Sequence, residues 1–238
     1  MGKVKIKRKS TLIDMTAMSD VTVLLLTFFM LTSTFLQKEP VTVITPSSVS
    51  EVKVPVANVA TILISPEGKV FMSITGDAEA ENKDTWGSEA IRAEILKNAV
   101  SEYNSLHPSN PVNLTEQDVA VFSKINMFGV PFRALPEFLR LSQTEQDKVI
   151  SDMSRADVGI PLDGNRDLTK PNEFQIWMRA IYSSSNDNLQ AMMKKGEGIA
   201  VKADHGTPYE RVHNVLDNLQ TLKMNRFSLM TALKTEQD

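Results

Sequence analysis

The stretch that decides the fold reads Asp14-Met-Thr-Ala-Met-Ser-Asp20-Val-Thr-Val-Leu-Leu-Leu-Thr-Phe-Phe-Met-Leu-Thr-Ser-Thr-Phe-Leu36. As a helix, residues 15–36 would extend roughly 33 Å, enough to cross a hydrocarbon core of about 30 Å. Residues 21–36 contain no charge, no Gly and no Pro, and their polar members are Thr or Ser, whose hydroxyls can bond back to a helix backbone. The sequence therefore predicts one membrane-spanning helix over residues 15–36.

Asp20 is the one charged residue within this predicted span. A carboxylate inside a bilayer is costly, so it is by default a functional-site hypothesis. Thr27 and Thr34 follow Asp20 at seven-residue intervals and Thr16 lies one turn before it, which puts all four near one helix face. Such a polar stripe requires a partner helix or a wet cavity. The alternative interpretation is that Asp20 lies at the headgroup boundary and caps the helix start.

The residues on either side of the span predict its orientation. Five basic residues precede it and no acidic residue comes before Asp14: Lys3, Lys5, Lys7, Arg8 and Lys9. The positive-inside rule then places the N-terminal tail in the cytoplasm and residues 38–238 outside it. A cleaved secretory signal is the alternative. Two features count against it, because the apolar run ends without an Ala-x-Ala cleavage pattern and a signal has no use for Asp20.

Composition limits the remaining function classes. The chain has 238 residues, a net charge of -3 and no Cys, which excludes disulfides, thiol catalysis and thiolate metal sites. The basic tail leaves about -6 on residues 38–238, and an acidic outer part argues against nucleic-acid binding. We find no nucleophile motif, no Gly-rich phosphate loop and no paired metal ligands. The sequence therefore predicts neither an enzyme nor a metal or cofactor site.

The region after the span reads as a linker followed by strands. Residues 37–50 contain two prolines among Ser and Thr, which predicts an extended and unpacked linker. Glu51-Val-Lys-Val-Pro55 alternates polar and apolar residues, and its Pro favours an edge strand. Residues 58–65 and 69–74 are strand-like and flank the turn Pro66-Glu-Gly68, so we expect a β-hairpin.

The rest of the chain mixes helices with two further strands. Between residues 77 and 170 the apolar spacing and capping patterns predict helices over 88–103, 115–122 and 142–155. From Pro171, placed at the first helical position, the pattern predicts the following: a helix through Ile181, a short helix over 189–195, a strand over 198–203, a helix begun by Thr207-Pro208-Tyr209-Glu210, and a last strand over 226–231. We expect an α+β fold with helices packed on a mixed β-sheet.

Three blocks of sequence occur in the order found in a known family. The segment Ile13-Asp14-Met-Thr-Ala-Met-Ser-Asp20-Val21 resembles the membrane signature of the ExbD/TolR biopolymer transport family. The hairpin over 61–74 resembles that family's first two strands, and residues 199–231 resemble its periplasmic strand, helix and strand. The resemblance divides the chain as follows: 1–14 cytoplasmic basic tail, 15–36 transmembrane helix, 37–50 periplasmic linker, 51–76 and 171–233 periplasmic domain, and 77–170 a large helical insertion.

The resemblance implies a role in a proton-driven motor of the bacterial inner membrane. Family members form a homodimer inside a ring of ExbB/TolQ-like subunits, and proton flow drives a TonB-like or TolA-like protein that reaches the outer membrane. Asp20 matches the family's essential intramembrane Asp, the proton carrier. Thr16, Thr27 and Thr34 would support a polar path by their spacing. The segment Glu51, Val52, Lys53, Val54 and Pro55 resembles the family's motif for partner contact.

Several alternatives stay open at the level of sequence. Ala17 stands where the family often has Pro, and the insertion over 77–170 has no assigned role. Nothing in the sequence separates a TonB-type system, which energises nutrient uptake, from a Tol-type system, which maintains the envelope. The different class of function is a membrane-tethered binding or scaffold module, in which the helix is only an anchor and Asp20 is not required.

Overall fold

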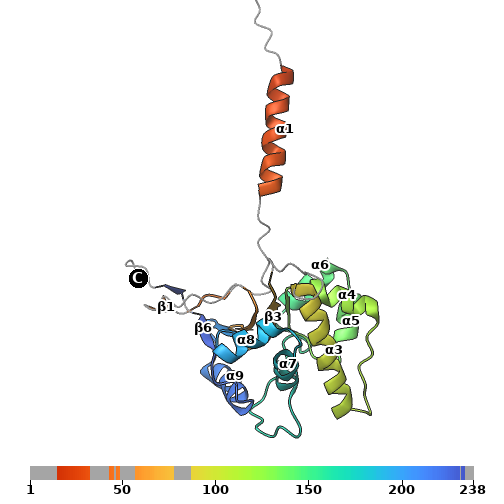
Figure 1. Cartoon of the computed structure of the whole chain (residues 1–238), viewed down its shortest axis with the longest axis vertical. Coiled ribbons are helices and arrows are strands. Elements are labelled where there is room, and N and C mark those ends of the chain that lie inside the picture. Colours follow the sequence, from red (N-terminus) through yellow and green to blue (C-terminus); the bar gives the residue numbers. More distant parts are fainter. Residues whose placement is uncertain are drawn as a thin grey trace, which may run out of the picture. The chain divides into compact units, whose positions relative to one another are not determined.

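The computed structural model describes residues 15–32, 43–45, 47–48, 57–77, 87–230 and 232–233. The chain divides into two compact units, Met1–Lys38 and Glu39–Asp238. The first contains helix α1 (Met15–Thr32), and the second contains all the strands and the remaining described helices (Figure 1).

Helix α1 is shorter than the span that the sequence predicts. Its 18 residues extend roughly 27 Å, and residues 33–36 lie outside the described part of the chain. Among the residues that the structure describes, no helix is both long and apolar enough to cross a membrane. The structure therefore confirms a helix over the first part of the predicted span but not a transmembrane helix.

The second unit is built on a five-stranded sheet with the order β4-β3-β2-β5-β6. Strands β2 (Val59–Ile64) and β3 (Val70–Thr75) are antiparallel and joined by a tight turn, so the predicted hairpin is confirmed. Gly68 in that turn has φ +78°, a left-handed conformation that favours glycine. Both faces of the hairpin are covered, since Ile62, Leu63 and Ile64 are fully buried although they alternate between the faces.

The C-terminal strand, helix and strand complete the sheet as expected. Strand β5 (Ile199–Ala203) pairs in parallel with β2, and β6 (Ser228–Met230) pairs in parallel with β5. Helix α9 (Tyr209–Thr221) connects them. Strand β4 (Met127–Phe128) pairs with the other edge of β3 and is too short to show a periodic pattern in the sequence. A separate two-stranded sheet joins β1 (Ser47–Ser48) to β7 (Ala232–Leu233).

The remaining helices largely follow the predictions. They are α3 (Ser88–Leu106), α4 (Glu116–Lys124), α5 (Leu135–Arg140), α6 (Gln143–Ser151), α7 (Glu173–Tyr182) and α8 (Asp187–Lys195). The predicted capping of α4 is present, because Thr115 Oγ1 accepts a bond from the N–H of Asp118 at 3.2 Å, and Asp118 Oδ2 accepts one from the N–H of Thr115 at 2.8 Å. Helix α6 ends at Ser151, one turn before the predicted end at Arg155.

Two predicted helix starts differ in detail. Pro171 lies before α7 rather than at its first position, and Asn172 caps the helix by accepting a bond from the N–H of Gln175 at 2.9 Å. Thr207 does not cap α9. Its hydroxyl donates to the carbonyl of Ser65 at 3.1 Å, which ties the start of α9 to the hairpin turn. In both cases a tertiary contact or a better capping residue outweighs the local pattern.

The predicted insertion shares one core with the sheet. Helix α3 packs on β3, α4 and α7, and the buried side chains of these elements form a single cluster. At its centre, the indole of Trp177 stacks on Phe132 with ring centroids 4.9 Å apart and planes 7° apart. Phe122 and Phe128 pack against the same indole. Residues 87–170 therefore contribute to the same core as the sheet.

Candidate functional site

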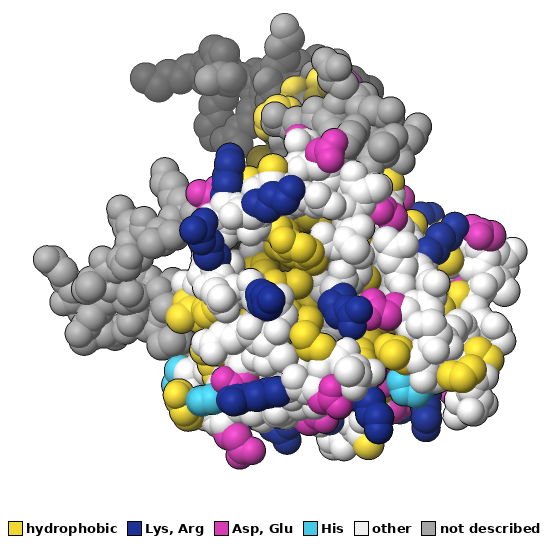
Figure 2. Space-filling view, turned by 60° about the horizontal axis from the view of Figure 1, so that its bottom comes forward, with side chains coloured by type: hydrophobic (Ala, Val, Ile, Leu, Met, Phe, Trp, Pro, Cys, Tyr) yellow, Lys and Arg dark blue, Asp and Glu magenta, His cyan; other side chains and the backbone are white. Residues whose placement is uncertain are grey.

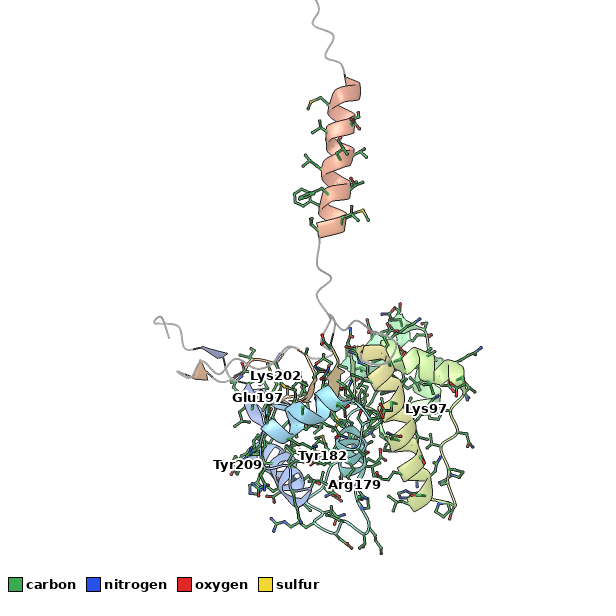
Figure 3. The ribbon with its side chains drawn as sticks, in the orientation of Figure 1. Lys97, Arg179, Tyr182, Glu197, Lys202 and Tyr209 are labelled. Atoms are coloured by element: carbon green, nitrogen blue, oxygen red, sulfur yellow. The ribbon has the colours of Figure 1, made fainter. Side chains whose placement is uncertain are left out.

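Helix α1 presents apolar side chains in every direction. Ten large hydrophobic side chains lie along it, each at least 50% exposed: Met18, Val21, Val23, Leu24, Leu25, Leu26, Phe28, Phe29, Met30 and Leu31. The sticks in Figure 3 project from all sides of this helix. A helix that is apolar all round is normally covered, either by a protein core or by lipid. Within its own unit, α1 has no described element to cover it.

Three Thr hydroxyls on α1 donate hydrogen bonds to the helix backbone, in agreement with the prediction from the sequence. Thr22 Oγ1 donates to the carbonyl of Ser19 at 2.8 Å, Thr27 Oγ1 to that of Leu24 at 2.9 Å, and Thr32 Oγ1 to that of Phe28 at 2.8 Å. These residues therefore place little unsatisfied polarity on an apolar surface. An ionised carboxylate cannot bond to a backbone carbonyl in this way, because it accepts hydrogen bonds and does not donate them.

The structure places part of the predicted polar stripe on one helix. Asp20 and Thr27 both lie in α1, seven residues apart and so on nearly the same face, and Thr16 lies one turn before Asp20. Thr34 lies outside the described residues. Thr27 borders a shallow apolar depression along the helix, lined further by Val21, Leu24, Leu25, Phe28 and Leu31. Thr27 thus lies beside a shallow apolar surface of the same helix.

The segment after the predicted span is partly packed, which the sequence did not predict. Val43 is 8% exposed, and the N–H of Ile44 donates to Asp204 Oδ2 at 2.7 Å. The carbonyl of Ile44 accepts a bond from the N–H of His205 at 2.9 Å. Asp204 also lies in a turn of its own, because Asp204 Oδ1 accepts a bond from the N–H of Gly206 at 2.7 Å.

One carboxylate oxygen of Asp204 therefore accepts a hydrogen bond within its own turn, and the other accepts one from Ile44 in the predicted linker. The hydrogen bond from Gly206, followed by the bond from Ile44, lowers the pKa of Asp204 below its usual value. The ionised carboxylate is the form that accepts both bonds. The predicted contact segment Glu51, Val52, Lys53, Val54 and Pro55 lies outside the described residues.

The chemistry available on α1 is that of a single carboxylate. Across the described part of the chain, no group of three or more His, Cys, Asp or Glu side chains is arranged to hold a metal ion. Asp20 stands alone on α1 as an acid, and proton uptake and release is the reaction that one isolated carboxyl group can carry out.

Comparison with protein families agrees with this pattern. The model of the biopolymer transport protein ExbD/TolR family matches residues 7–125, half of the chain. The chain belongs to the ExbD/TolR family. Family membership implies a part in the energy transduction of biopolymer transport, and association with partners of the ExbB/TolQ and TonB/TolA types in general. No curated protein and no solved structure matches the chain.

The extent of the ExbD/TolR match bears on the predicted domain division. It includes α1 and the hairpin, and it continues through α3 and α4 to residue 125. It does not extend over residues 171–233, where the sequence resembled the family's strand, helix and strand. The order β5, α9, β6 in the structure nevertheless agrees with that expectation.

Proposed function

We propose that this ExbD/TolR family member is the single-span subunit of a proton-driven motor in the bacterial inner membrane. In this proposal residues 15–36 cross the membrane, the basic tail is cytoplasmic and residues 38–238 are periplasmic. Two copies associate with ExbB-like subunits, and the motor energises outer-membrane transport through a TonB-like protein. The observation that carries the proposal is Asp20, a lone carboxylate on a helix that is apolar all round.

The exposed surface of α1 supports a partner in the membrane. Fully burying a Leu, Phe or Met side chain is worth about 1.5–3 kcal/mol, so ten uncovered side chains are a strong drive toward lipid or another helix. Lipid alone can cover the apolar residues. Asp20 additionally requires a polar partner or water, and the depression beside Thr27 offers a surface on which a neighbouring helix would fit.

Asp20 has the role of proton carrier in this proposal. A carboxylate among apolar helices loses its charge by taking up a proton, and it recovers the charge on release to water. Each proton that crosses a potential of 100 mV supplies about 2.3 kcal/mol. The neutral form of Asp20 would favour apolar surroundings and the ionised form would favour water. Alternation between the two forms would move the helix, and proton flow would thereby produce movement.

The direct test is Asp20→Asn in cells that depend on the chain, with Asp20→Glu beside it. Asn keeps the size and hydrogen bonding of Asp but cannot ionise, so transport that depends on the proton motive force should be lost. Glu keeps the carboxyl group and should retain part of the activity. Membrane level and dimerisation are measured in parallel. Unchanged transport with Asp20→Asn would contradict the proposal and leave the helix as a tether.

Two Thr residues provide a matched test of the polar stripe. Thr22 and Thr27 are both exposed on α1, and both hydroxyls bond to the helix backbone. They differ in position, since Thr27 shares the face of Asp20 and Thr22 lies on the opposite side. Thr27→Val should therefore slow proton-dependent transport, whereas Thr22→Val should not. Equal effects would show that the stripe has no special role.

Orientation can be tested because the chain contains no Cys. A single Ser109→Cys substitution lies on an exposed stretch of the second unit. A membrane-impermeant maleimide should label it from outside in spheroplasts if residues 38–238 are periplasmic. Cells that carry Asp20→Asn separate the alternatives, because loss of nutrient uptake indicates a TonB-type system and loss of envelope integrity a Tol-type one.

A further inference from the structure

A pocket of about 310 Å³ opens at the amino ends of strands β5 and β6. Helices α7, α8 and α9 all end beside it. Its lining combines apolar and basic side chains: Tyr182, Met193, Lys194, Ile199, Lys223, Met224, Asn225 and Arg226. Small-molecule and peptide-side-chain sites have volumes from about 300 Å³ upward, so the pocket is large enough for one.

The floor of the pocket is apolar and its rim is positively charged. Met193, Ile199 and Met224 are all more than 90% buried, whereas Lys194, Lys223 and Arg226 are exposed. Figure 2 shows hydrophobic side chains gathered in a hollow on one face of the molecule, with Lys and Arg side chains around it. Tyr182, labelled in Figure 3 at the end of α7, is about half exposed and adds an aromatic wall.

Among the described residues, the three cations on the rim have no carboxylate partner. Lys194, Lys223 and Arg226 form no ion pair within the described residues, although five other Lys and Arg side chains there do form one: Lys97, Arg140, Arg155, Arg166 and Arg179. This group of unpaired positive charge stands in a part of the chain whose net charge is negative. Glu197, the nearest acidic residue in the sequence, does not line the pocket.

Lys223 occupies an unfavourable backbone conformation. Its φ is +61°, the left-handed region in which a residue with a Cβ is destabilised by about 1–2 kcal/mol relative to glycine. It follows the end of α9 at the position that helices usually fill with Gly or Asn. The equivalent position after α8 is indeed a glycine, Gly196, with φ +88°. A Lys in a strained backbone conformation beside a pocket suggests a function for its side chain.

The positions of the cations at helix ends offer a purely structural explanation for them. Helix C-termini have partial negative charge, about half a unit each, and Lys or Arg near them is stabilising. Lys194 lies in the last turn of α8, so this accounts for its presence. The same effect does not explain Arg226, which lies just before β6. It also does not explain why Lys223 occupies the left-handed position after α9, where Asn or Gly would be more stable.

We propose that this pocket binds an acidic peptide segment of a partner protein, with a carboxylate on the rim and an adjacent aliphatic side chain on the floor. Lys and Arg would donate charge-assisted hydrogen bonds to the carboxylate. The two methionines would adapt to the aliphatic side chain, because thioether side chains fill irregular surfaces. Charge complementarity selects this occupant, and the apolar floor favours a peptide over a fully polar anion such as phosphate. The proposal is independent of Asp20.

The test uses the full chain in detergent, labelled with carbon-13 at the methionine methyl groups. Met193 and Met224 are assigned from Met193→Leu and Met224→Leu variants and report on the floor. Three probes are titrated: a capped six-residue peptide with two Asp flanked by Leu, the same peptide with Asn in place of Asp, and inorganic phosphate. The acidic peptide should shift both methyl resonances in a saturable manner, and its affinity should fall as salt is raised.

Variants on the rim identify the groups responsible. Lys223→Asn removes the charge while keeping a residue that tolerates left-handed backbone, so the fold should be retained. It should weaken binding of the acidic peptide about five-fold, a loss expected for one partly exposed charge-assisted hydrogen bond. Lys97→Gln is the matched control, an exposed Lys away from the pocket that is paired with Glu116. It should leave the affinity unchanged.

Each outcome decides the proposal. Specific shifts with the acidic peptide, weakened by Lys223→Asn and not by Lys97→Gln, support it. Equal binding of the Asn peptide, equal binding of phosphate, or no shift of either methionine up to millimolar peptide would overturn it. A loss of thermal stability with Lys223→Asn and no change in affinity would show that the Lys serves only the end of α9.

Discussion

Helix α1 and the β2–β3 hairpin contain the same kinds of apolar residue in opposite situations. Each large hydrophobic side chain listed above for α1 is at least half exposed, whereas Ile62, Leu63 and Ile64 on β2 are fully buried. The hairpin therefore buries its large hydrophobic residues within its own unit, whereas those of α1 depend on surroundings outside their unit. Exposed apolar side chains such as those of α1 indicate a site of interaction, whereas buried ones such as those of β2 stabilise the fold.

A variant that affects α1 alone tests most directly whether the two units have separate roles. Asp20→Asn should abolish proton-dependent transport and leave the thermal unfolding of the second unit unchanged, since Asp20 lies in the other compact unit. Unfolding is followed by circular dichroism on the purified full chain. A fall in the unfolding temperature of several degrees would contradict the division of roles between the two units.

The opposite variant should destabilise the fold. Trp177 is fully buried and stacks on Phe132, so Trp177→Ala should lower the free energy of unfolding by about 3–5 kcal/mol. Domains are typically stable by only about 5–15 kcal/mol, so the cellular level of the protein should also fall. Denaturant unfolding measures the change. Tyr209→Ala, at an aromatic residue that is 78% exposed, is the control and should change stability by less than about 0.5 kcal/mol.

Trp177→Phe refines the same prediction. The indole N–H is buried and has no hydrogen-bond partner among the described residues, so Phe loses volume but also removes an unsatisfied donor. We expect Trp177→Phe to be clearly less destabilising than Trp177→Ala. A loss as large as that of Ala would mean that the indole makes a contact which stacking and burial do not explain.

A buried cation joins the predicted insertion to the hairpin. Arg92 on α3 is 3% exposed, and its guanidinium donates to the carbonyl of Ile74 at 2.7 Å and to that of Ser123 at 3.2 Å. Burial lowers its pKa, which shows that the charge is held at some cost. Arg92→Met should leave both carbonyls unpaired and reduce stability by about 1–3 kcal/mol. Lys148→Met, exposed on α6, should change it by less than about 0.5 kcal/mol.

Periodic patterns in the sequence predicted most of the second unit. Two strand-like runs on either side of the turn Pro66-Glu-Gly68 predicted the hairpin, and capping residues such as Thr115 predicted helix starts that the structure confirms. What the patterns missed depends on contacts between distant residues. Strand β4 has only two residues, and the role of Thr207 requires the carbonyl of Ser65 to be nearby.

The candidate sites divide in the same way. Asp20 could be identified from the sequence, because a lone charge in an apolar run is a local signal. The contact between Asp204 and Ile44 joins residues 160 positions apart, and no local pattern reveals it. The basic pocket likewise brings together the ends of three helices, and in the sequence its cations look like ordinary surface residues.

The Asp204 contact gives a prediction of intermediate size that includes pH. Asp204→Asn leaves one acceptor oxygen where the carboxylate has two, so one of the bonds from Ile44 and Gly206 must be lost. Amide hydrogen exchange at Ile44 should become faster. Asp217→Asn is the control, since Asp217 pairs with Arg166 on the surface and does not contact the linker.

The sign of the pH effect follows from the direction of the shift. The pKa of Asp204 is lowered in the folded chain, so its contribution is present above the ordinary Asp value of about 3.9 and is lost as pH falls through the folded value. Exchange at Ile44, corrected for the intrinsic rate, should thus be steady near neutral pH and rise only in acid. A rise between pH 5 and 7 would show that another group controls the contact.

The smallest expected effect concerns the two helix ends beside the basic pocket. Lys223→Gly relieves a left-handed residue that has a Cβ and should stabilise the fold by about 0.5–1 kcal/mol, although it removes a charge from the end of α9. Gly196→Ala should do the reverse and by more, because the new Cβ would lie 2.4 Å from Cβ of Arg226 as well as in a strained backbone. Denaturant unfolding of both variants measures the pair. If Lys223→Gly destabilises the protein, Lys223 stabilises the end of α9, and its position no longer indicates a function at the pocket. If it stabilises the protein while peptide binding is lost, stability and binding are opposed at this one residue.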